Sequence, residues 1–155
     1  MDCSGRNECM TLYHGSSAWE KILEVGFDLE HPRRSDPGDF GWGLYLSANP
    51  ARARSYGKVL KVSLDPSRLA YISNPYFLDR FERVEPKTEE EKLFYGLVFD
   101  GDIMKTVNLP SDLRVAAAKL VRQVFLEKGY TGIRTSLDDE ETVLFSLSAI
   151  QRVSL

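Results

Sequence analysis

Short apolar runs separated by turn residues dominate the first half of the chain. Residues 10–14 are β-prone, and the run stops at the small residues Gly15, Ser16 and Ser17. Ser17 and Glu20 then have the spacing of a capping box, which predicts the start of a helix. The apolar residues of this helix keep roughly helical spacing, and they are Trp19, Ile22, Leu23 and Val25. Gly26 stands where a left-handed C-terminal cap belongs.

The middle of the chain alternates between loop, strand and helix signals. Residues 28–41 are rich in proline, glycine and mixed charge, which is typical of an irregular loop. Residues 44–46 form a short apolar run between turn signals, and we expect a strand there. Asn49 followed by Pro50 predicts a helix that runs to about Tyr56. Residues 59–64 alternate as a strand does, with one face made of Leu60, Val62 and Leu64.

An acidic segment interrupts this pattern at residues 82–102. It carries seven acidic and three basic residues. Thr88 and Glu91 have capping-box spacing, which predicts a helix through Phe99. We interpret the segment as a solvated helix that covers the sheet, and a partner-binding surface stays the alternative.

The last third of the chain gives the clearest helix and two closing strands. A helix is predicted from Ser111 to about Lys128, and Gly129 ends it. Its apolar stripe consists of Leu113, Ala116, Ala117, Leu120, Val121, Val124 and Phe125. Strands are expected at 130–135 and 142–145, on either side of an acidic turn.

The order of these elements predicts the class of fold. Strands and helices alternate irregularly, which favours an α+β fold over a regular doubly wound α/β fold. The sequence contains neither a dinucleotide-binding glycine fingerprint after a strand nor a P-loop. Residues 1–9 are polar and unpatterned, so we expect a flexible leader followed by a single domain at 10–155.

Composition narrows the class of protein further. The 155 residues are 43% hydrophobic and 28% charged, which is typical of a globular domain. The net charge of −3 gives no global electrostatic reason to bind nucleic acid or an anionic membrane. Cys3 and Cys9 could pair only with each other, and with the histidines His14 and His31 they form no zinc-ligand cluster, so we expect neither a disulfide scaffold nor a metal site. No run approaches the ~18 apolar residues of a membrane span, and we expect a cytoplasmic protein without a membrane partner.

Three apolar runs carry an unusual polar residue at one end. His14 ends the first run, Tyr45 lies in the second with Tyr56 eleven residues later, and Glu141 precedes the third. Each has a structural interpretation when it is taken alone. Such a histidine is often hydrogen-bonded within the fold, a strand tyrosine is often core, and a glutamate before a strand is often a solvated turn residue.

Taken together, these residues resemble the ADP-ribosyltransferase superfamily, in the branch of diphtheria toxin and the poly(ADP-ribose) polymerases that is named for its His-Tyr-Glu triad. The motif His14-Gly15-Ser16 matches the first signature of that family, and Gly41-x-Gly43-Leu44-Tyr45-Leu46 with Tyr56 matches the second. Glu141 followed by Thr142 to Ile150 is similar to the third. The resemblance runs from about residue 11 to 153 and is weakest over 65–110. Residues 126–134 also resemble small bacterial and phage members of the superfamily.

The resemblance implies a fold of two packed, mainly antiparallel β-sheets flanked by helices around an NAD cleft. It implies an enzyme, a mono-ADP-ribosyltransferase that uses NAD as co-substrate and modifies a macromolecular acceptor, either protein or nucleic acid. By analogy, the resemblance suggests toxin, effector, defence or counter-defence roles. An antitoxin or inhibitor would then be a partner, and delivery into the cytosol of a target cell would be the alternative location. No metal is implied.

The family's residue roles carry over by position. Glu141 would stabilise the oxocarbenium-like sugar, His14 would orient NAD, and Tyr45 and Tyr56 would clamp the nicotinamide ring. The Gly15 backbone would pair with the carboxamide. The cofactor-binding set implied by the motifs is His14, Gly15, Ser16, Gly43, Tyr45 and Tyr56.

Other positions bear on specificity. Asp139 and Glu140 lie in the loop that contacts the acceptor in the family, and Asp139 stands where arginine-modifying relatives of the other branch often carry Glu or Gln. An ordinary acidic turn is the alternative. Arg33 and Arg34 would steer the NAD pyrophosphate or a nucleic acid, or serve only solubility. Ala53 replaces a serine that often touches nicotinamide in the polymerases.

Three other functions stay open. An NAD glycohydrolase performs the same bond cleavage with water as acceptor. A non-catalytic NAD or ADP-ribose reader would keep the fold, although such a module does not need Glu141. An RNA 2′-phosphotransferase also carries a similar histidine motif, but its additional basic triad is not found beside the candidate site.

Overall fold

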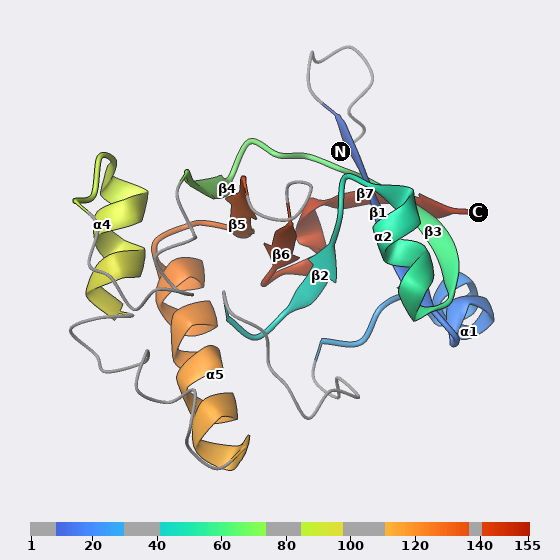
Figure 1. Cartoon of the computed structure of the whole chain (residues 1–155), viewed down its shortest axis with the longest axis horizontal. Helices are drawn as coiled ribbons and strands as arrows, with labels where there is room; N and C mark the ends of the chain where they lie inside the picture. Colours follow the sequence, from blue (N-terminus) through green and yellow to red (C-terminus); the bar gives the residue numbers. More distant parts are fainter. Residues whose placement is uncertain (1–8, 30–40, 74–84, 98–110, 137–140) are drawn as a thin grey trace.

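The computed structural model describes residues 9–29, 41–73, 85–97, 111–136 and 141–155 (Figure 1). The strands are β1 (Met10–Ser16), β2 (Leu44–Leu46), β3 (Lys58–Leu64), β4 (Leu69–Ile72), β5 (Gly132–Thr135), β6 (Thr142–Leu144) and β7 (Ile150–Ser154). The helices are α1 (Trp19–Val25), α2 (Pro50–Ala53), α4 (Glu89–Tyr95) and α5 (Ser111–Glu127), with short 3-10 helices η1 (Arg54–Tyr56) and η4 (Leu147–Ala149).

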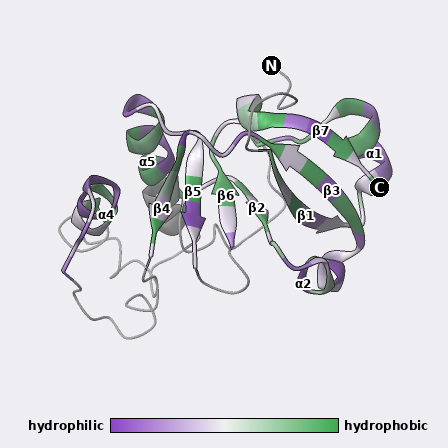
Figure 2. Cartoon of the chain, turned by 90° about the horizontal axis from the view of Figure 1, so that it is seen from above, coloured by the Kyte–Doolittle hydropathy of each residue, from purple (hydrophilic) through white to green (hydrophobic). Residues whose placement is uncertain are grey.

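The strands form two sheets, and the fold is α+β as the element order predicts. One sheet has the order β1-β3-β7 and the other β2-β6-β5-β4. Every pairing is antiparallel except that of β4 with β5, which is parallel. Figure 2 shows α4 and α5 beside the four-stranded sheet, and α1 and α2 beside the three-stranded one.

The two sheets meet where β1 passes the end of β2. Tyr13 and Ser47 exchange two backbone hydrogen bonds across this junction, of 2.8 and 2.9 Å. A hydrophobic cluster lies between the sheets, and its buried members are Leu12, Leu29, Leu44, Leu46, Val62, Leu64 and Leu144. The predicted apolar face of β3 is confirmed, because its three leucine and valine side chains are fully buried. The junction therefore fixes the ends of β1 and β2 relative to each other.

Helix α5 covers the outer face of the four-stranded sheet. Val121 and Phe125 are buried against Ile133, Val143 and Phe145. The predicted bounds of α5 are close to those found, and Gly129 follows it with φ of 93°. The predicted stripe is too wide, because Ala116 and Leu120 are exposed; the side chains of Leu113 and Ala117 lie outside the description.

Helix α4 has one buried face and one exposed face. Thr88 caps it by accepting a hydrogen bond from the Glu91 backbone N–H, as predicted, and the α-helix extends to Tyr95. Gly96 and Leu97 continue as a π-helical turn, and the predicted end at Phe99 lies outside the described residues. Phe94 and Tyr95 join the core beside α5, and Glu91 is 2% exposed. The other face, with Glu89 and Lys92, is exposed, so α4 is a helix that covers the sheet with one face and is solvated on the other, as interpreted from the sequence.

Three hydrogen bonds hold the buried Glu91 carboxylate. Its oxygens accept from the Ser73 backbone N–H at 3.1 Å, the Ser73 hydroxyl at 2.6 Å and the Lys87 backbone N–H at 2.8 Å. Burial raises the pKa of Glu91, but these hydrogen bonds outweigh burial and the net pKa lies below its usual value. Burial and the neighbouring Glu91 charge raise the pKa of Tyr95 to about 12. The carboxylate joins α4 to the end of β4.

Helix α1 departs from its prediction. It begins at Trp19 with Ala18 as N-cap and no capping side chain, because the Ser16 hydroxyl accepts from the Ala18 backbone N–H instead. None of its residues is fully buried: Trp19 and Ile22 are half-buried, and Leu23 and Val25 are exposed, so the predicted apolar face is covered only in part. Gly26 ends the helix at a positive φ of 87°, but its ψ of 179° is extended, so the predicted left-handed helical cap is not formed.

The remaining findings concern two strands, one cysteine and the described helices. Strands β4 and β7 were not predicted. Cys9 is disulfide-bonded. In the described ranges, no helix is long and apolar enough to cross a membrane, and no three metal-ligating side chains gather. Residues 1–8 of the predicted leader lie outside these ranges.

Candidate active site

The end of β1 supplies the histidine of the first motif. His14 Nδ1 lies 3.0 Å from the Tyr45 backbone carbonyl on β2. A carbonyl oxygen only accepts, so Nδ1 carries the proton in this contact. The ring also packs edge-on against Phe27, with centroids 5.2 Å apart. These two contacts, one of them from the other sheet, set the orientation of the imidazole.

Gly15 allows helix α2 to approach β1 closely. A β-carbon at Gly15 would collide with the backbone carbonyl of Ala53 at the end of α2. The helix itself starts as predicted, with the Asn49 side chain accepting from the Ala51 backbone N–H at 2.9 Å and Pro50 in the first turn. The missing side chain at Gly15 thus permits α2 to lie against the histidine strand.

The second motif builds strand β2 and the approach to it. A β-carbon at Gly43 would collide with the Leu144 backbone carbonyl on β6, so glycine permits the close pairing of these two strands. Gly41 has a φ of 119°, a backbone conformation that residues other than glycine rarely adopt. Its carbonyl accepts a 2.7 Å hydrogen bond from the Tyr45 hydroxyl. Tyr45 is only 8% exposed, which makes it a fixed ring in the wall of the site.

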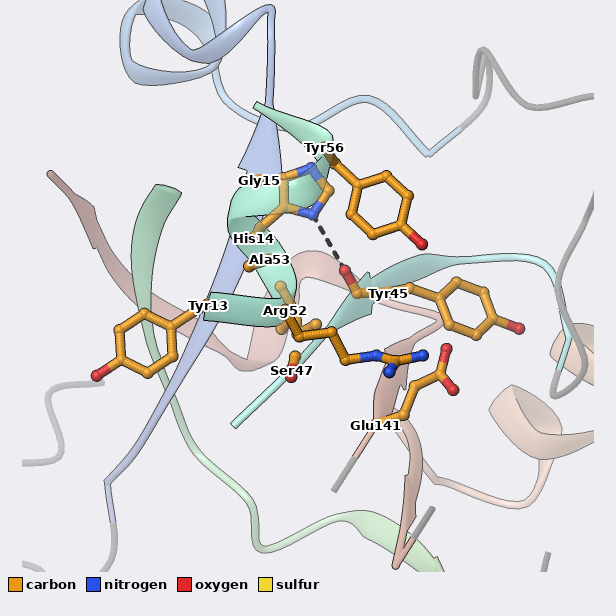
Figure 3. Close-up of a pocket in the computed structure, with 10 residues that line it drawn as sticks. Tyr13, His14, Gly15, Tyr45, Ser47, Arg52, Ala53, Tyr56 and Glu141 are labelled. Carbon is orange, nitrogen blue, oxygen red and sulfur yellow. Dashed lines mark hydrogen bonds between the residues drawn. The ribbon is translucent and has the colours of Figure 1, made fainter. Parts of the chain in front are cut away.

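The two tyrosines of the motif differ in exposure. Tyr56, at the end of η1, is 65% exposed, whereas Tyr45 is buried. Both line the same cavity, and Figure 3 shows their rings on the same side of the site. Tyr56 is therefore the ring that is free to adjust to a ligand, and Tyr45 is the ring that is held.

The backbone of Glu141 is held by strand β5 of the four-stranded sheet. Its carbonyl accepts from the Thr135 backbone N–H at 3.0 Å and the Thr135 hydroxyl at 2.8 Å. Its side chain is partly exposed and extends into the site, where the carboxylate and the Arg52 guanidinium point toward each other (Figure 3). The loop residues just before it, 137–140, lie outside the described residues.

These elements enclose a cavity with two adjoining lobes. The inner lobe, of about 60 Å³, contains Glu141, and its lining is Tyr13, His14, Gly15, Tyr45, Leu46, Ser47, Arg52, Ala53, Tyr56 and Glu141. The outer lobe, of about 350 Å³, lies toward α1. Both lobes share His14, Gly15, Tyr45 and Tyr56. The cavity has a narrow end with a carboxylate and a wider end beside α1.

Most of the predicted site residues come together here. Seven line one or both lobes, and they are His14, Gly15, Ser16, Gly43, Tyr45, Tyr56 and Glu141. Asp139 and Glu140, predicted to recognise the acceptor, lie outside the described residues, as do Arg33 and Arg34.

The sequence interpretation missed Arg52. It lies four residues before Tyr56, and α2 and η1 are consecutive helical turns. Residues four apart on a helix share a face. This spacing was the available signal that Arg52 would reach the same cavity as Tyr56.

Comparison with known proteins adds little. No protein-family model matches the chain, and no curated protein matches it. A solved structure titled "Crystal structure of an anti-CRISPR protein" aligns over 96% of this chain and 96% of that chain, with 14% identity and a TM-score of 0.43. An alignment at that score supports no conclusion about this chain.

Proposed function

We propose that the chain is an NAD-dependent mono-ADP-ribosyltransferase, which cleaves the bond between nicotinamide and ribose and transfers ADP-ribose to a macromolecular acceptor. One observation carries the proposal. His14, Tyr45, Tyr56 and Glu141, which are up to 127 residues apart in the sequence, line one cavity between two sheets. If each residue only stabilised its own strand or helix, there would be no reason for the four side chains to line the same cavity.

The inner lobe suits the chemistry of bond cleavage. The breaking bond develops positive charge on the sugar, so a carboxylate beside that sugar stabilises the transition state more than the ground state. Glu141 is the only acidic side chain that lines the inner lobe among the described residues. Its carboxylate would stabilise the cation and accept a hydrogen bond from a ribose hydroxyl.

The two tyrosine rings, His14 and the outer lobe suit the nicotinamide and the adenosine side of NAD. Tyr45 and Tyr56 offer two ring faces to a flat nicotinamide, at low conformational entropy cost. His14, held by the Tyr45 carbonyl, presents an oriented imidazole to the adenosine-side ribose. The outer lobe gives the remainder of the dinucleotide room beside α1. The fit thus depends on groups that the two sheets already hold in place.

The proposal also includes transfer of a single ADP-ribose unit to the acceptor. A single transfer is the inference, because the chain has no room for the long insertions of the polymerases. The acceptor is a protein or a nucleic acid, and a toxin, effector or defence role is the setting that the resemblance suggests.

The test uses NAD labelled in its adenine, a cell lysate as the source of acceptors, and mass spectrometry of the products. We expect nicotinamide release with label on protein or nucleic acid by the wild type, and neither by Glu141→Gln. The matched control is Glu127→Gln, an exposed glutamate on α5, which should behave like the wild type. Nicotinamide release with only free ADP-ribose would favour the glycohydrolase instead. Bound but intact NAD would favour the reader, and no binding would overturn all three.

A further inference from the structure

Arg52 occupies a position that none of the motifs explains. It lies on α2 and lines the inner lobe together with Glu141 and Ala53. Figure 3 shows its guanidinium reaching across this lobe toward the Glu141 carboxylate. Among the described residues, Arg52 is the only Lys or Arg that lines the inner lobe.

The backbones that carry these two side chains are fixed independently. Helix α2 is capped by Asn49, lies against Gly15, and has the Arg52 carbonyl bonded by the Ser55 hydroxyl at 2.8 Å. The Glu141 carbonyl is held by two groups of Thr135, on β5. One side chain therefore comes from beside the three-stranded sheet, and the other comes from the start of β6, an interior strand of the four-stranded sheet. The two side chains meet in the cavity between the sheets.

We propose that Arg52 is a positioning residue for Glu141, which holds the carboxylate turned into the inner lobe. The inference rests on the proposed transferase function. A glutamate side chain has three rotatable bonds, so a partly exposed carboxylate has several rotamers available. A planar guanidinium restricts that freedom because it can bond both carboxylate oxygens at once. A carboxylate already in place at the reacting sugar lowers the barrier without reorganisation.

This role differs from direct binding of NAD by Arg52. A residue that contacts an NAD phosphate alters the affinity for NAD whatever stands at position 141. A residue that acts through Glu141 alters turnover, and its effect disappears once the carboxylate is gone. The two roles are separated by a double-mutant cycle.

The experiment measures nicotinamide release by the wild type, Arg52→Gln, Glu141→Gln and the double variant. We expect Arg52→Gln to lower kcat by about tenfold or more while KM for NAD changes by about twofold at most. In the Glu141→Gln background, Arg52→Gln should cause no further loss. Arg52→Lys should recover part of kcat, and the control Arg54→Gln, two residues away and outside the inner lobe, should match the wild type. An effect of equal size in both backgrounds, or one confined to KM, would overturn the proposal.

Crystal structures of Arg52→Gln and Arg54→Gln provide a measurement that does not depend on turnover. The Glu141 carboxylate should leave its position in Arg52→Gln and keep it in Arg54→Gln. An unmoved carboxylate in Arg52→Gln would overturn the positioning role, even if the wild type cleaves NAD. A displaced carboxylate in a protein that never cleaves NAD would support the pairing and overturn the transferase.

Discussion

Glu91 and Glu141 show how differently one side chain type is used at two places in this molecule. Glu91 is 2% exposed between α4 and β4, and three donors from Ser73 and Lys87 satisfy its carboxylate. Glu141 is partly exposed and reaches into a cavity whose lining also includes Arg52, His14 and two tyrosine rings. The first carboxylate faces protein donors alone, and the second, beside the Arg52 guanidinium, also faces a space that a ligand can enter.

The difference separates a structural carboxylate from a chemical one. Removing a buried, fully bonded carboxylate leaves its donors without partners, so the free energy of unfolding falls. Removing a carboxylate that faces a ligand site leaves few protein groups unsatisfied, so the loss falls on catalysis. Substitution of Glu91 should therefore lower mainly the free energy of unfolding, and substitution of Glu141 should lower mainly turnover.

The largest effect is expected at Glu141. Glu141→Gln should lower kcat for nicotinamide release by about 100-fold or more, which is about 2.7 kcal/mol in the barrier. The dissociation constant for NAD should change little, because the amide keeps the size of the carboxylate. Steady-state kinetics and calorimetric NAD titration measure the two quantities. An equal loss of binding and turnover would indicate a structural role and erase the contrast with Glu91.

Glu91 should show the opposite behaviour. Glu91→Ala should lower the free energy of unfolding by about 2 to 3 kcal/mol, since it leaves the donors of Ser73 and Lys87 unpaired. Urea unfolding followed by circular dichroism gives this number. Glu89→Ala is the control, because Glu89 is an exposed partner of Lys92 and its loss should cost at most about 0.5 kcal/mol. Equal costs in the two variants would show that the buried network stabilises nothing.

Gly15→Ala should affect both stability and the site. The new methyl group collides with the Ala53 carbonyl, so α2 must shift, at a cost of about 1 to 3 kcal/mol. The shift carries Arg52 and Tyr56 away from the cavity and should weaken NAD binding. Gly129→Ala, at positive φ beyond α5, should cost about 1 kcal/mol without changing NAD binding. Unaltered NAD affinity in Gly15→Ala would contradict the importance of the α2 contact.

The pH dependence of stability should also follow Glu91. Because its pKa is lower in the folded state, its stabilisation is present above its usual pKa of 4.5 and is lost as the pH falls through the folded value. Thermal unfolding of the wild type should therefore move to lower temperature on acidification. Glu91→Gln should flatten that dependence relative to Glu89→Gln, and identical profiles would contradict the direction of the shift.

Ala53→Ser should give the smallest effect. The residue is 4% exposed and lines the inner lobe, where polymerases of the resembled family often have a serine. One new hydrogen bond to nicotinamide is worth about 0.5 to 1.5 kcal/mol, so inhibition by free nicotinamide should strengthen by about twofold to tenfold. Ala51→Ser, on the exposed side of α2, is the matched control. Weaker inhibition in Ala53→Ser would indicate that nicotinamide does not bind beside residue 53.

The features that the sequence predicts well are those decided by nearby residues. Asn49 and Pro50 start α2 as expected, the alternation in β3 gives its buried face, and Gly26 and Gly129 both adopt positive φ. The shared site of Tyr45 and Tyr56 was expected from the family resemblance rather than from the local pattern, and both residues line the inner lobe.

The features that the sequence misses depend on distant partners. Strand β4 is four residues long and pairs in parallel with β5, which is more than 60 residues away. Glu91 is buried because Ser73 at the end of β4 binds it, which no local pattern shows. The burial predicted for the apolar stripe of α1 is wrong for Leu23 and Val25 for the same reason. An apolar stripe is buried only when another element covers it.

The central claim is that NAD binds in this cavity with its nicotinamide ribose beside Glu141. The most direct measurement is a crystal structure of the Glu141→Gln variant with intact NAD. The account predicts the nicotinamide ring between Tyr45 and Tyr56, the adjacent ribose at residue 141, and the adenosine toward α1. NAD bound outside the two lobes, or reversed with its adenine in the inner lobe, would contradict it.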